Sequence, residues 1–270
     1  LLFSEMEDNR MRVILAEKPS VAQSIAAVLG ADQKKNGYLQ GENDLVSWCI
    51  GHLIELAPPE IYDARYAKWR REDLPIVPSA WESVVSDGTK KQFAVLKELL
   101  NRADVDEVVC ATDAGREGEL IFRMVYEKTG CIKPFKRLWI SSLEESAIRE
   151  GFRSLKPGTA YDALYRAALC RAQADWLVGI NGTRLYSRLY GTKLNVGRVM
   201  TPTLAMIVER EKAVAGFTPK PFYSVHLLCP CEAVSERFED EQEAQALADA
   251  CNGQIAEIIR VEKKTRSDRP

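Results

Sequence analysis

The sequence predicts an α/β fold, a Rossmann-like parallel sheet with helices on both faces, followed by a mainly α-helical region and the start of a β-containing region. Two observations predict it. Short apolar runs alternate with segments of helical periodicity as far as about residue 156, which is typical of strands joined by crossover helices. From Tyr161 the chain becomes rich in Ala, Leu and Arg, and strand-like runs return only after Pro219.

The expected elements of the first part follow from this pattern. Met11–Ala16 is a buried strand, because every residue except Arg12 is apolar. Ser20 to Gln23 has the form of a capping box and opens a helix that reaches Leu29. The further expected elements are a strand at 45–50, a long surface excursion at 58–79, a helix at 89–101, a strand at 106–111, a helix at 118–128, a strand at 136–140 and a helix that ends near 154.

The second part is expected to be helical at 161–180 and at 201–214, where Pro202 lies in the first turn and is tolerated. A loop with glycines and cations, 191–198, joins these helices. A strand at 222–228, a helix at 242–251, a strand at 255–261 and a polar linker at 266–270 complete the chain. We place domain limits at 11–156, 157–216 and 217–270, and interpret residues 1–10 as an extension or a remnant of cloning.

Composition narrows the class of protein. The chain of 270 residues has 46% hydrophobic and 28% charged residues, which is ordinary for a globular protein. It has no apolar run of membrane-spanning length, and its seven scattered cysteines are typical of reduced thiols in a cytoplasmic protein. A net charge of −2 excludes a uniformly basic surface, but residues 161–208 hold six Arg or Lys against two Asp. We expect a local basic face there.

Acidic residues follow two of the predicted strands at the point where each strand ends. Glu17 comes directly after the first strand, and Asp113 and Glu117 follow the strand at 106–111. Functional residues of parallel sheets gather at the carboxyl ends of strands, so these three carboxylates are expected to converge. Carboxylate oxygens are the ligands that Mg²⁺ takes in proteins, and Lys18 would add a positive charge for a phosphate. The alternative is that Glu117 and Glu119 are ordinary acids at a helix N-terminus.

Four segments, taken together and in this order, closely resemble the bacterial type IA DNA topoisomerases of the topoisomerase III kind. They are MRVILAEKPS at 11–20, SWCIGHL at 47–53, ATDAGREGE at 111–119 and NVGRVMTP at 195–202. The resemblance covers 11–270 and implies a Toprim domain followed by the family's helical DNA-binding domain and the start of its β-rich gate domain. It also implies a monomer that acts on single-stranded DNA in the bacterial cytoplasm, associated with the nucleoid.

The resemblance assigns roles by position. Glu17 is similar to the family's metal-binding and acid–base glutamate, and Lys18 to the lysine that stabilises the scissile phosphate. Asp113 and Glu117 match the first and last acids of the Toprim D-x-D-x-E pattern, but Gly115 stands where a second aspartate is usual. Glu119, water or a looser metal site would then compensate. The expected DNA contacts are His52, Arg171, Asp175, Arg184, Asn195, Val196, Gly197, Arg198, Val199 and Met200.

The family cleaves DNA with a tyrosine in a motif similar to Tyr-x-Arg-Thr, and none of the nine tyrosines here has that setting. The resemblance therefore implies an ATP-independent strand-passage enzyme of which this chain is an inactive N-terminal part. Two alternatives stay open. A Toprim nuclease or primase would share the acids but not the segment at 195–202, and a DNA-binding module with a lapsed metal site would fit Gly115.

Overall fold

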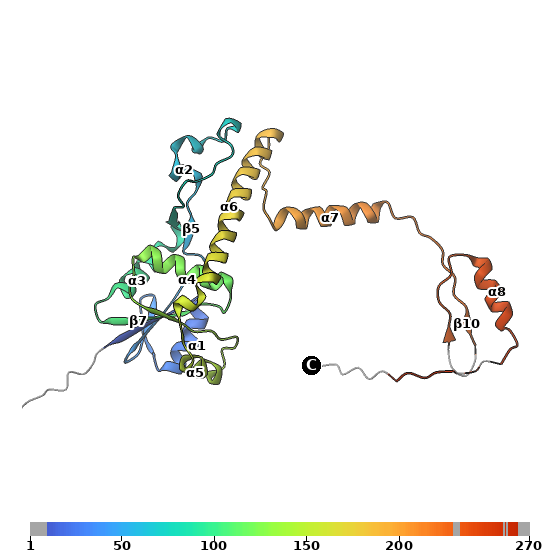
Figure 1. The fold of residues 1–270 in the computed structure, drawn as a ribbon, viewed down its shortest axis with the longest axis horizontal. Helices are drawn as coiled ribbons and strands as arrows, with labels where there is room; N and C mark the ends of the chain where they lie inside the picture. Colours follow the sequence, from blue (N-terminus) through green and yellow to red (C-terminus); the bar gives the residue numbers. More distant parts are fainter. Residues whose placement is uncertain (1–9, 229–232, 256, 258, 264–270) are drawn as a thin grey trace, which may run out of the picture. The chain divides into compact units, whose positions relative to one another are not determined.

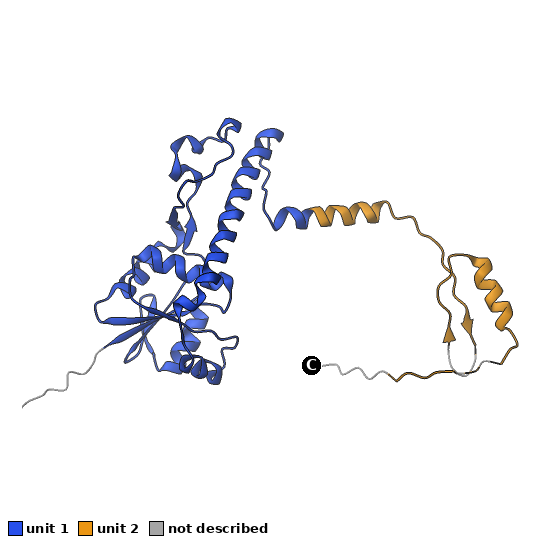
Figure 2. Ribbon diagram, viewed as in Figure 1, with its two compact units in different colours: residues 1–204 blue, residues 205–270 orange. Residues whose placement is uncertain are grey.

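The computed structural model describes residues 10–228, 233–255, 257 and 259–263. The chain divides into two compact units, Leu1–Leu204 and Ala205–Pro270 (Figure 2). Both the predicted α/β part and most of the predicted helical part belong to the first unit. No helix in the described part of the chain is long and apolar enough to cross a membrane.

A seven-stranded mixed sheet forms the centre of the first unit (Figure 1). The central strands β4, β1, β7 and β8 run parallel, as predicted, whereas β2, β3 and β9 add antiparallel edges. Short edge strands were not predicted, because three residues carry too little periodicity to recognise. In sheet order the strands are β2 (Gln33–Lys35), β3 (Tyr38–Gln40), β4 (Asp44–Trp48), β1 (Met11–Ala16), β7 (Val105–Ala111), β8 (Phe135–Arg137) and β9 (Lys156–Pro157).

Helices cover both faces of this sheet. Alternate residues of β1 enter different clusters, with Val13 and Leu15 on one face and Ile14 and Ala16 on the other. The first face packs against α3 (Lys90–Asn101) and α4 (Arg116–Thr129) through Leu96, Leu99, Leu120 and Phe122. The second face packs against α1 (Pro19–Leu29) and α5 (Glu145–Arg153) through Ala22, Ile25 and Ile148. The predicted helices on both faces are confirmed.

Two predicted helix limits are wrong. Ser20 does not cap α1, because Pro19 already occupies the first helical position and Lys18 is the N-cap residue. The expected helix at 161–180 continues as α6 (Asp162–Tyr190) until Gly191 adopts a positive φ of 67°. Asn181 and Gly182 do not end this helix, because Asn181 bonds the backbone of Ile76 and Gly182 gives room to the side chain of Val196.

The excursion at 58–79 is bracketed by a small antiparallel sheet of β5 (Ile54–Leu56) and β6 (Ser83–Val85). It contains α2 (Pro59–Tyr62) and 3₁₀ turns at Ala64–Ala67 and Arg71–Asp73, and it lies beside the upper part of α6 (Figure 1). Further 3₁₀ turns, Asp87–Thr89 and Gly158–Tyr161, precede α3 and α6.

The helix α7 (Met200–Ala215) includes the boundary between the units. Within the second unit, β10 (His226–Leu227) pairs antiparallel with β11 (Ala233–Val234), and Asp240 caps α8 (Glu241–Cys251) by accepting a hydrogen bond from the N–H of Gln242. The strand expected at 222–228 is thus only two residues long. The strand expected at 255–261 does not form at the described residues 255, 257 and 259–261, while 256, 258 and the expected linker at 266–270 lie outside the described residues.

Candidate functional site

Glu17 and Asp113 meet at the carboxyl ends of β1 and β7. These strands are parallel neighbours with Ala16 opposite Ala111, so the residues that follow them emerge at the same edge of the sheet. The backbone N–H of Asp113 donates a hydrogen bond to Glu17 Oε2 at 3.1 Å. Lys18 Nζ lies 3.6 Å from Asp113 Oδ2 and 4.0 Å from Glu17 Oε1. The expected convergence of these two acids is confirmed. The Lys18 ammonium lies near both carboxylates and offsets part of their negative charge.

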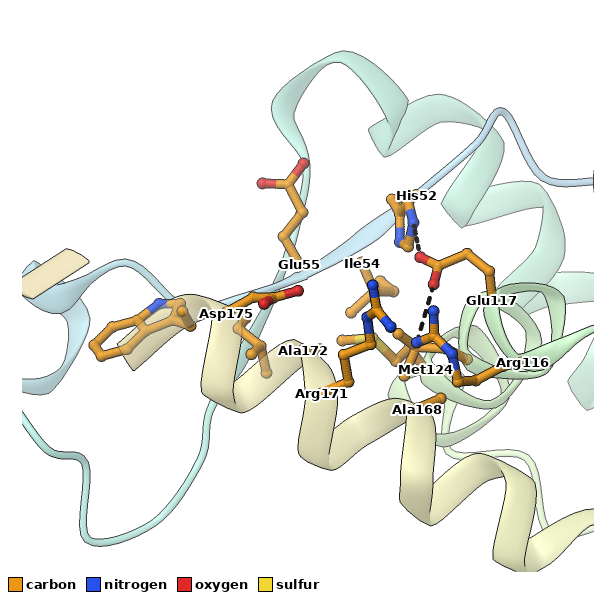
Figure 3. Close-up of a pocket in the computed structure, with 13 residues that line it drawn as sticks. His52, Ile54, Glu55, Arg116, Glu117, Met124, Ala168, Arg171, Ala172 and Asp175 are labelled. Atoms are coloured by element: carbon orange, nitrogen blue, oxygen red, sulfur yellow. Dashed lines mark ion pairs between the residues drawn. The ribbon is translucent and has the colours of Figure 1, made fainter. Parts of the chain in front are cut away.

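Glu117 does not join that pair in this structure. It lies in the first turn of α4, where His52 Nε2 is 2.9 Å from its Oε1 and Arg116 Nη1 is 3.7 Å from its Oε2 (Figure 3). Over the described residues, no group of three or more His, Cys, Asp or Glu side chains is arranged to hold a metal ion. Glu17 and Asp113 supply carboxylate oxygens of the kind that a divalent cation takes, but Glu117 is engaged with His52 and adds no third carboxylate to them.

The turn that carries Asp113 is shaped by two residues that pack against its backbone. A Cβ on Gly118 would lie 2.2 Å from the carbonyl oxygen of Asp113, so only glycine allows α4 to approach this closely. From β8, the fully buried Arg137 donates through Nη2 to the carbonyl of Asp113 at 2.6 Å, and through Nη1 to the carbonyls of Cys110, Thr112 and Leu138. Sequence reasoning missed Arg137, although an arginine inside an apolar strand was the available signal.

Glu119 is not a spare metal ligand, so that part of the sequence interpretation is wrong. Its side chain is fully buried, with Oε1 2.9 Å from Arg123 Nε and Oε2 3.1 Å from Arg137 Nε. The contact with Arg137 is an ion pair without hydrogen-bond geometry, since neither of those two atoms has a hydrogen-bond partner. Arg123 also binds Asp162 at 2.6 Å, which ties α4 to the start of α6. Glu119 therefore neutralises buried guanidinium groups behind the Asp113 turn.

A pocket of about 390 Å³ lies between α4, α6 and β5 (Figure 3). Its polar lining includes His52, Arg116 and Glu117 on one side and Arg171 and Asp175 from α6 on the other. Glu55 of β5 also lines it (Figure 3), and the remaining side chains are apolar, namely Ile54, Leu56, Leu120, Met124, Ala168, Ala172 and Trp176. Three carboxylates, Glu55, Glu117 and Asp175, thus face two arginines and a histidine, and of these cations Arg171 is the one not paired with a lining acid and can donate to an anionic group such as a phosphate.

Asp175 pairs with the loop that follows α6 rather than with Arg171. Its carboxylate accepts hydrogen bonds from Arg198 Nε and, at 3.4 Å, from Arg198 Nη2. These bonds hold the pKa of Asp175 below its ordinary value. The sequence left open an Arg171–Asp175 ion pair or a phosphate clamp. Within the described part of the chain Arg171 has no hydrogen-bond or ion-pair partner, so its guanidinium is available in the pocket.

The loop at 191–199 is fixed to α6 by its backbone. The N–H of Val196 donates to Thr183 Oγ1 at 2.9 Å, and that of Leu194 donates to Ser187 Oγ at 2.9 Å. Gly197 donates to Thr201 Oγ1 at 3.0 Å, and a Cβ placed on Gly197 would meet nothing closer than 3.8 Å. Val199 and Met200 are 65% and 51% exposed. The backbone of Gly197 is thus open to approach, as its predicted role requires.

Two further predicted residues, the buried Arg184 and the exposed Asn195, lie in this region. Arg184 is buried, and it donates to the carbonyl of Tyr66 at 2.7 Å and to Glu60 Oε1 at 2.9 Å. Its contact with DNA stays a prediction, and it would require these bonds to open. Asn195 lines a second hollow of about 480 Å³ beside α6, together with Trp69, Asp175 and Trp176. The indole N–H of Trp176 donates to the carbonyl of Ala57, so this ring anchors the excursion.

The first unit combines a mixed sheet that has acids at its strand ends with a long helix that carries exposed arginines. Comparison with protein families places both features in the DNA topoisomerases. The Toprim domain model matches residues 12–143, and the DNA topoisomerase model matches residues 159–270. The chain therefore belongs to the type IA DNA topoisomerases.

Within that family its relatives are DNA topoisomerases 3. It is 45% identical to the one of Shouchella clausii over 97% of this chain, and 51% identical to the one of Bacillus subtilis over 79%. It spans 37% and 29% of the length of these curated relatives. Full-length topoisomerase I of Thermotoga maritima superposes with a TM-score of 0.60 over 87% of this chain and 37% of that one, at 23% identity, which supports the fold.

Proposed function

We propose that this chain is the part of a topoisomerase III that holds the scissile region of a single DNA strand and a Mg²⁺ ion. The observation that carries the proposal is the meeting of Glu17, Lys18 and Asp113 at the strand ends. In the whole enzyme the activity would be transient cleavage of one strand, passage of another and religation, without ATP. The setting would be the nucleoid of the bacterial cytoplasm, with the protein acting as a monomer.

Lys18 and Glu17 would perform complementary parts of the cleavage step. A tyrosine hydroxyl attacks phosphorus, the bond from phosphorus to the 3′ oxygen breaks, and the phosphate stays on the enzyme as a 5′-phosphotyrosine. Lys18 would place its charge on the phosphate oxygens as negative charge builds there. Glu17 in its protonated form would give its proton to the departing 3′ oxygen and take it back during religation.

Glu17 and Asp113 are the residues that would hold Mg²⁺, with Glu117 as the third carboxylate and Gly115 contributing no side-chain ligand. A bound Mg²⁺ supplies positive charge to phosphate oxygens. Lys18 offsets part of the negative charge of Asp113 and Glu17, which lie 3.6 and 4.0 Å from its Nζ, so we expect weak Mg²⁺ binding by the chain.

The strand itself would lie along the pocket that Arg116 and Arg171 border, with His52 and the backbone of 195–200 as further contacts. Each cation that pairs with a phosphate releases counterions, so binding should weaken linearly with the logarithm of salt concentration. The nine tyrosines lack the family's cleavage motif, and we infer that this chain binds a strand without cutting it.

Titration calorimetry with Mg²⁺ and fluorescence anisotropy with a labelled single strand test the proposal together. We expect measurable Mg²⁺ heats for the unchanged chain, their loss in Glu17→Ala, and salt-dependent DNA binding in both. Null heats for both proteins, with DNA binding intact, would instead favour a DNA-binding module with a lapsed metal site. Steady Mg²⁺-dependent cutting without a protein–DNA adduct would favour a Toprim nuclease. No DNA binding at low salt would overturn the proposal.

A further inference from the structure

The excursion at 58–79 carries a cationic segment whose charges have no partner. Lys68, Arg70 and Arg71 are exposed and flank Trp69. Throughout the described residues none of these three cations has a hydrogen-bond or ion-pair partner for its side chain, whereas their neighbour Arg65 pairs with Asp63 and Asp73. Glu72 offsets one charge, so residues 68–72 carry three cations and one acid, a net charge of +2. A local excess of this kind stands out in a chain whose net charge is −2.

This segment is held in place by contacts with α6. Asn181 accepts from the N–H of Ile76 at 2.6 Å and donates to its carbonyl at 2.9 Å, as a backbone partner would. Farther along the helix, Arg184 binds the carbonyl of Tyr66 and the carboxylate of Glu60, and its guanidinium carbon lies 5.4 Å from the centre of the Trp69 ring. These anchors fix both ends of the segment at 66–76, so Lys68, Arg70 and Arg71 stand on a positioned support.

Two hollows flank the segment: Arg71 lines one of about 600 Å³ with Asn181 and Gly182, and Trp69 lines another that adjoins the pocket of the candidate site. Trp69 lines the 480 Å³ hollow, and Asp175 and Trp176 line both that hollow and the 390 Å³ pocket with Arg116 and Arg171. Arg184 lies thirteen positions after Arg171 on α6. At a rise of 1.5 Å per residue this is about 20 Å, a length that several nucleotides would follow.

We propose that Lys68, Arg70 and Arg71 form a second phosphate-backbone contact for single-stranded nucleic acid, distal to the carboxylates along α6. The inference rests on the proposed function, since it assumes that a strand occupies the first pocket. Paired phosphate contacts contribute affinity and salt dependence without reading sequence, which is what exposed, unpartnered Lys and Arg side chains provide. The excursion thereby acts as a clamp on the strand rather than as a spacer.

The test compares two triple charge reversals by anisotropy with a labelled 20-nucleotide single strand at several salt concentrations. Lys68→Glu/Arg70→Glu/Arg71→Glu removes the proposed contact. Lys34→Glu/Lys35→Glu/Lys91→Glu is the matched control, because it makes the same change of charge at exposed positions on β2 and α3. We expect the affinity of the first variant to fall about ten- to hundredfold near 0.1 M salt. The slope of log K against log salt concentration should decrease in magnitude by about 2, because each of the three phosphate contacts contributes about 0.7.

The control should lose at most about twofold, as a general effect of net charge without a lost contact. Equal losses in the two variants would overturn the inference, and so would an equal loss for duplex DNA in the first variant. Failure of the unchanged chain to bind any single strand would instead overturn the proposed function. If the charge reversal lowers the melting temperature, the Lys68→Gln/Arg70→Gln/Arg71→Gln variant replaces it, and its DNA affinity and salt slope are compared with those of the unchanged chain.

Discussion

Two glycines close to Asp113 differ in what a side chain would meet. A Cβ at Gly118 would lie 2.2 Å from the Asp113 carbonyl oxygen, whereas one at Gly115 would meet nothing within 4 Å. Gly115 has a φ of −174°, an extended conformation open to any residue. Both glycines lie in the segment DAGREG at 113–118, and the sequence alone could not show which of them is closely packed.

Gly118→Ala is therefore expected to destabilise the chain by about 1–3 kcal/mol, because the Asp113 turn or α4 must shift to make room. Urea unfolding followed by circular dichroism measures the loss. Gly115→Ala, the matched control, should change the free energy of unfolding by less than about 1 kcal/mol. Similar losses in both variants would mean that the close packing of Gly118 against Asp113 does not constrain the turn.

Gly115→Asp should improve Mg²⁺ binding, because it adds a carboxylate to a turn that holds only one at Asp113. Gly115 is also the N-cap residue of α4, so Asp and Asn should each stabilise the helix by a few tenths of a kcal/mol. Gly115→Asn separates the effects, since it caps the helix without adding charge. We expect calorimetry to show several-fold tighter Mg²⁺ binding for Asp and no change for Asn. Equal affinities would argue against a carboxylate role at this position.

At the scale of the elements, β8 and α4 are joined by a buried charge network behind the Asp113 turn. Glu119 lies between Arg123 and Arg137, and Arg137 is fully buried. Removing one partner of a buried pair leaves an uncompensated charge, which costs about 3–5 kcal/mol. We expect Glu119→Gln to lose a comparable amount in urea unfolding, whereas Glu145→Gln, in the exposed pair with Arg149, should lose less than about 1 kcal/mol. Equal losses would show that the network is solvated.

The elements also show what could be predicted from sequence. The apolar runs at 13–16 and 108–111 predicted two parallel strands, and hence the meeting of Glu17 with Asp113, because parallel neighbours end at the same edge. Three-residue strands such as β2 gave no periodic signal. The length of α6 was underestimated because Asn181 and Gly182, which favour turns, are used for tertiary contacts there. The pairing of Glu117 with His52 could not be predicted, because the two residues are far apart in the sequence and no local pattern indicates that they meet.

At the scale of the molecule, burial is divided unequally between the two units. The first unit contains two apolar clusters around its sheet. In the second unit Ala244 is the one described residue that is buried, and α7 buries no residue. Cooperative resistance to local opening comes from buried apolar contacts, so the units should differ strongly in local stability.

Limited proteolysis should therefore cut first in α7 or in the described residues of the second unit, and leave a resistant core that contains the seven-stranded sheet. Proteases need a locally unfolded segment, and α7 offers exposed apolar residues such as Met206 and Ile207 without packing to hold them. Mass spectrometry of a thermolysin time course identifies the cuts. Hydrogen exchange on the intact chain should agree, with slow amides in β1 and β7 and fast ones in α7 and α8. Early cleavage within the sheet, or slow exchange in α7, would mean that the second unit is as firmly folded as the first.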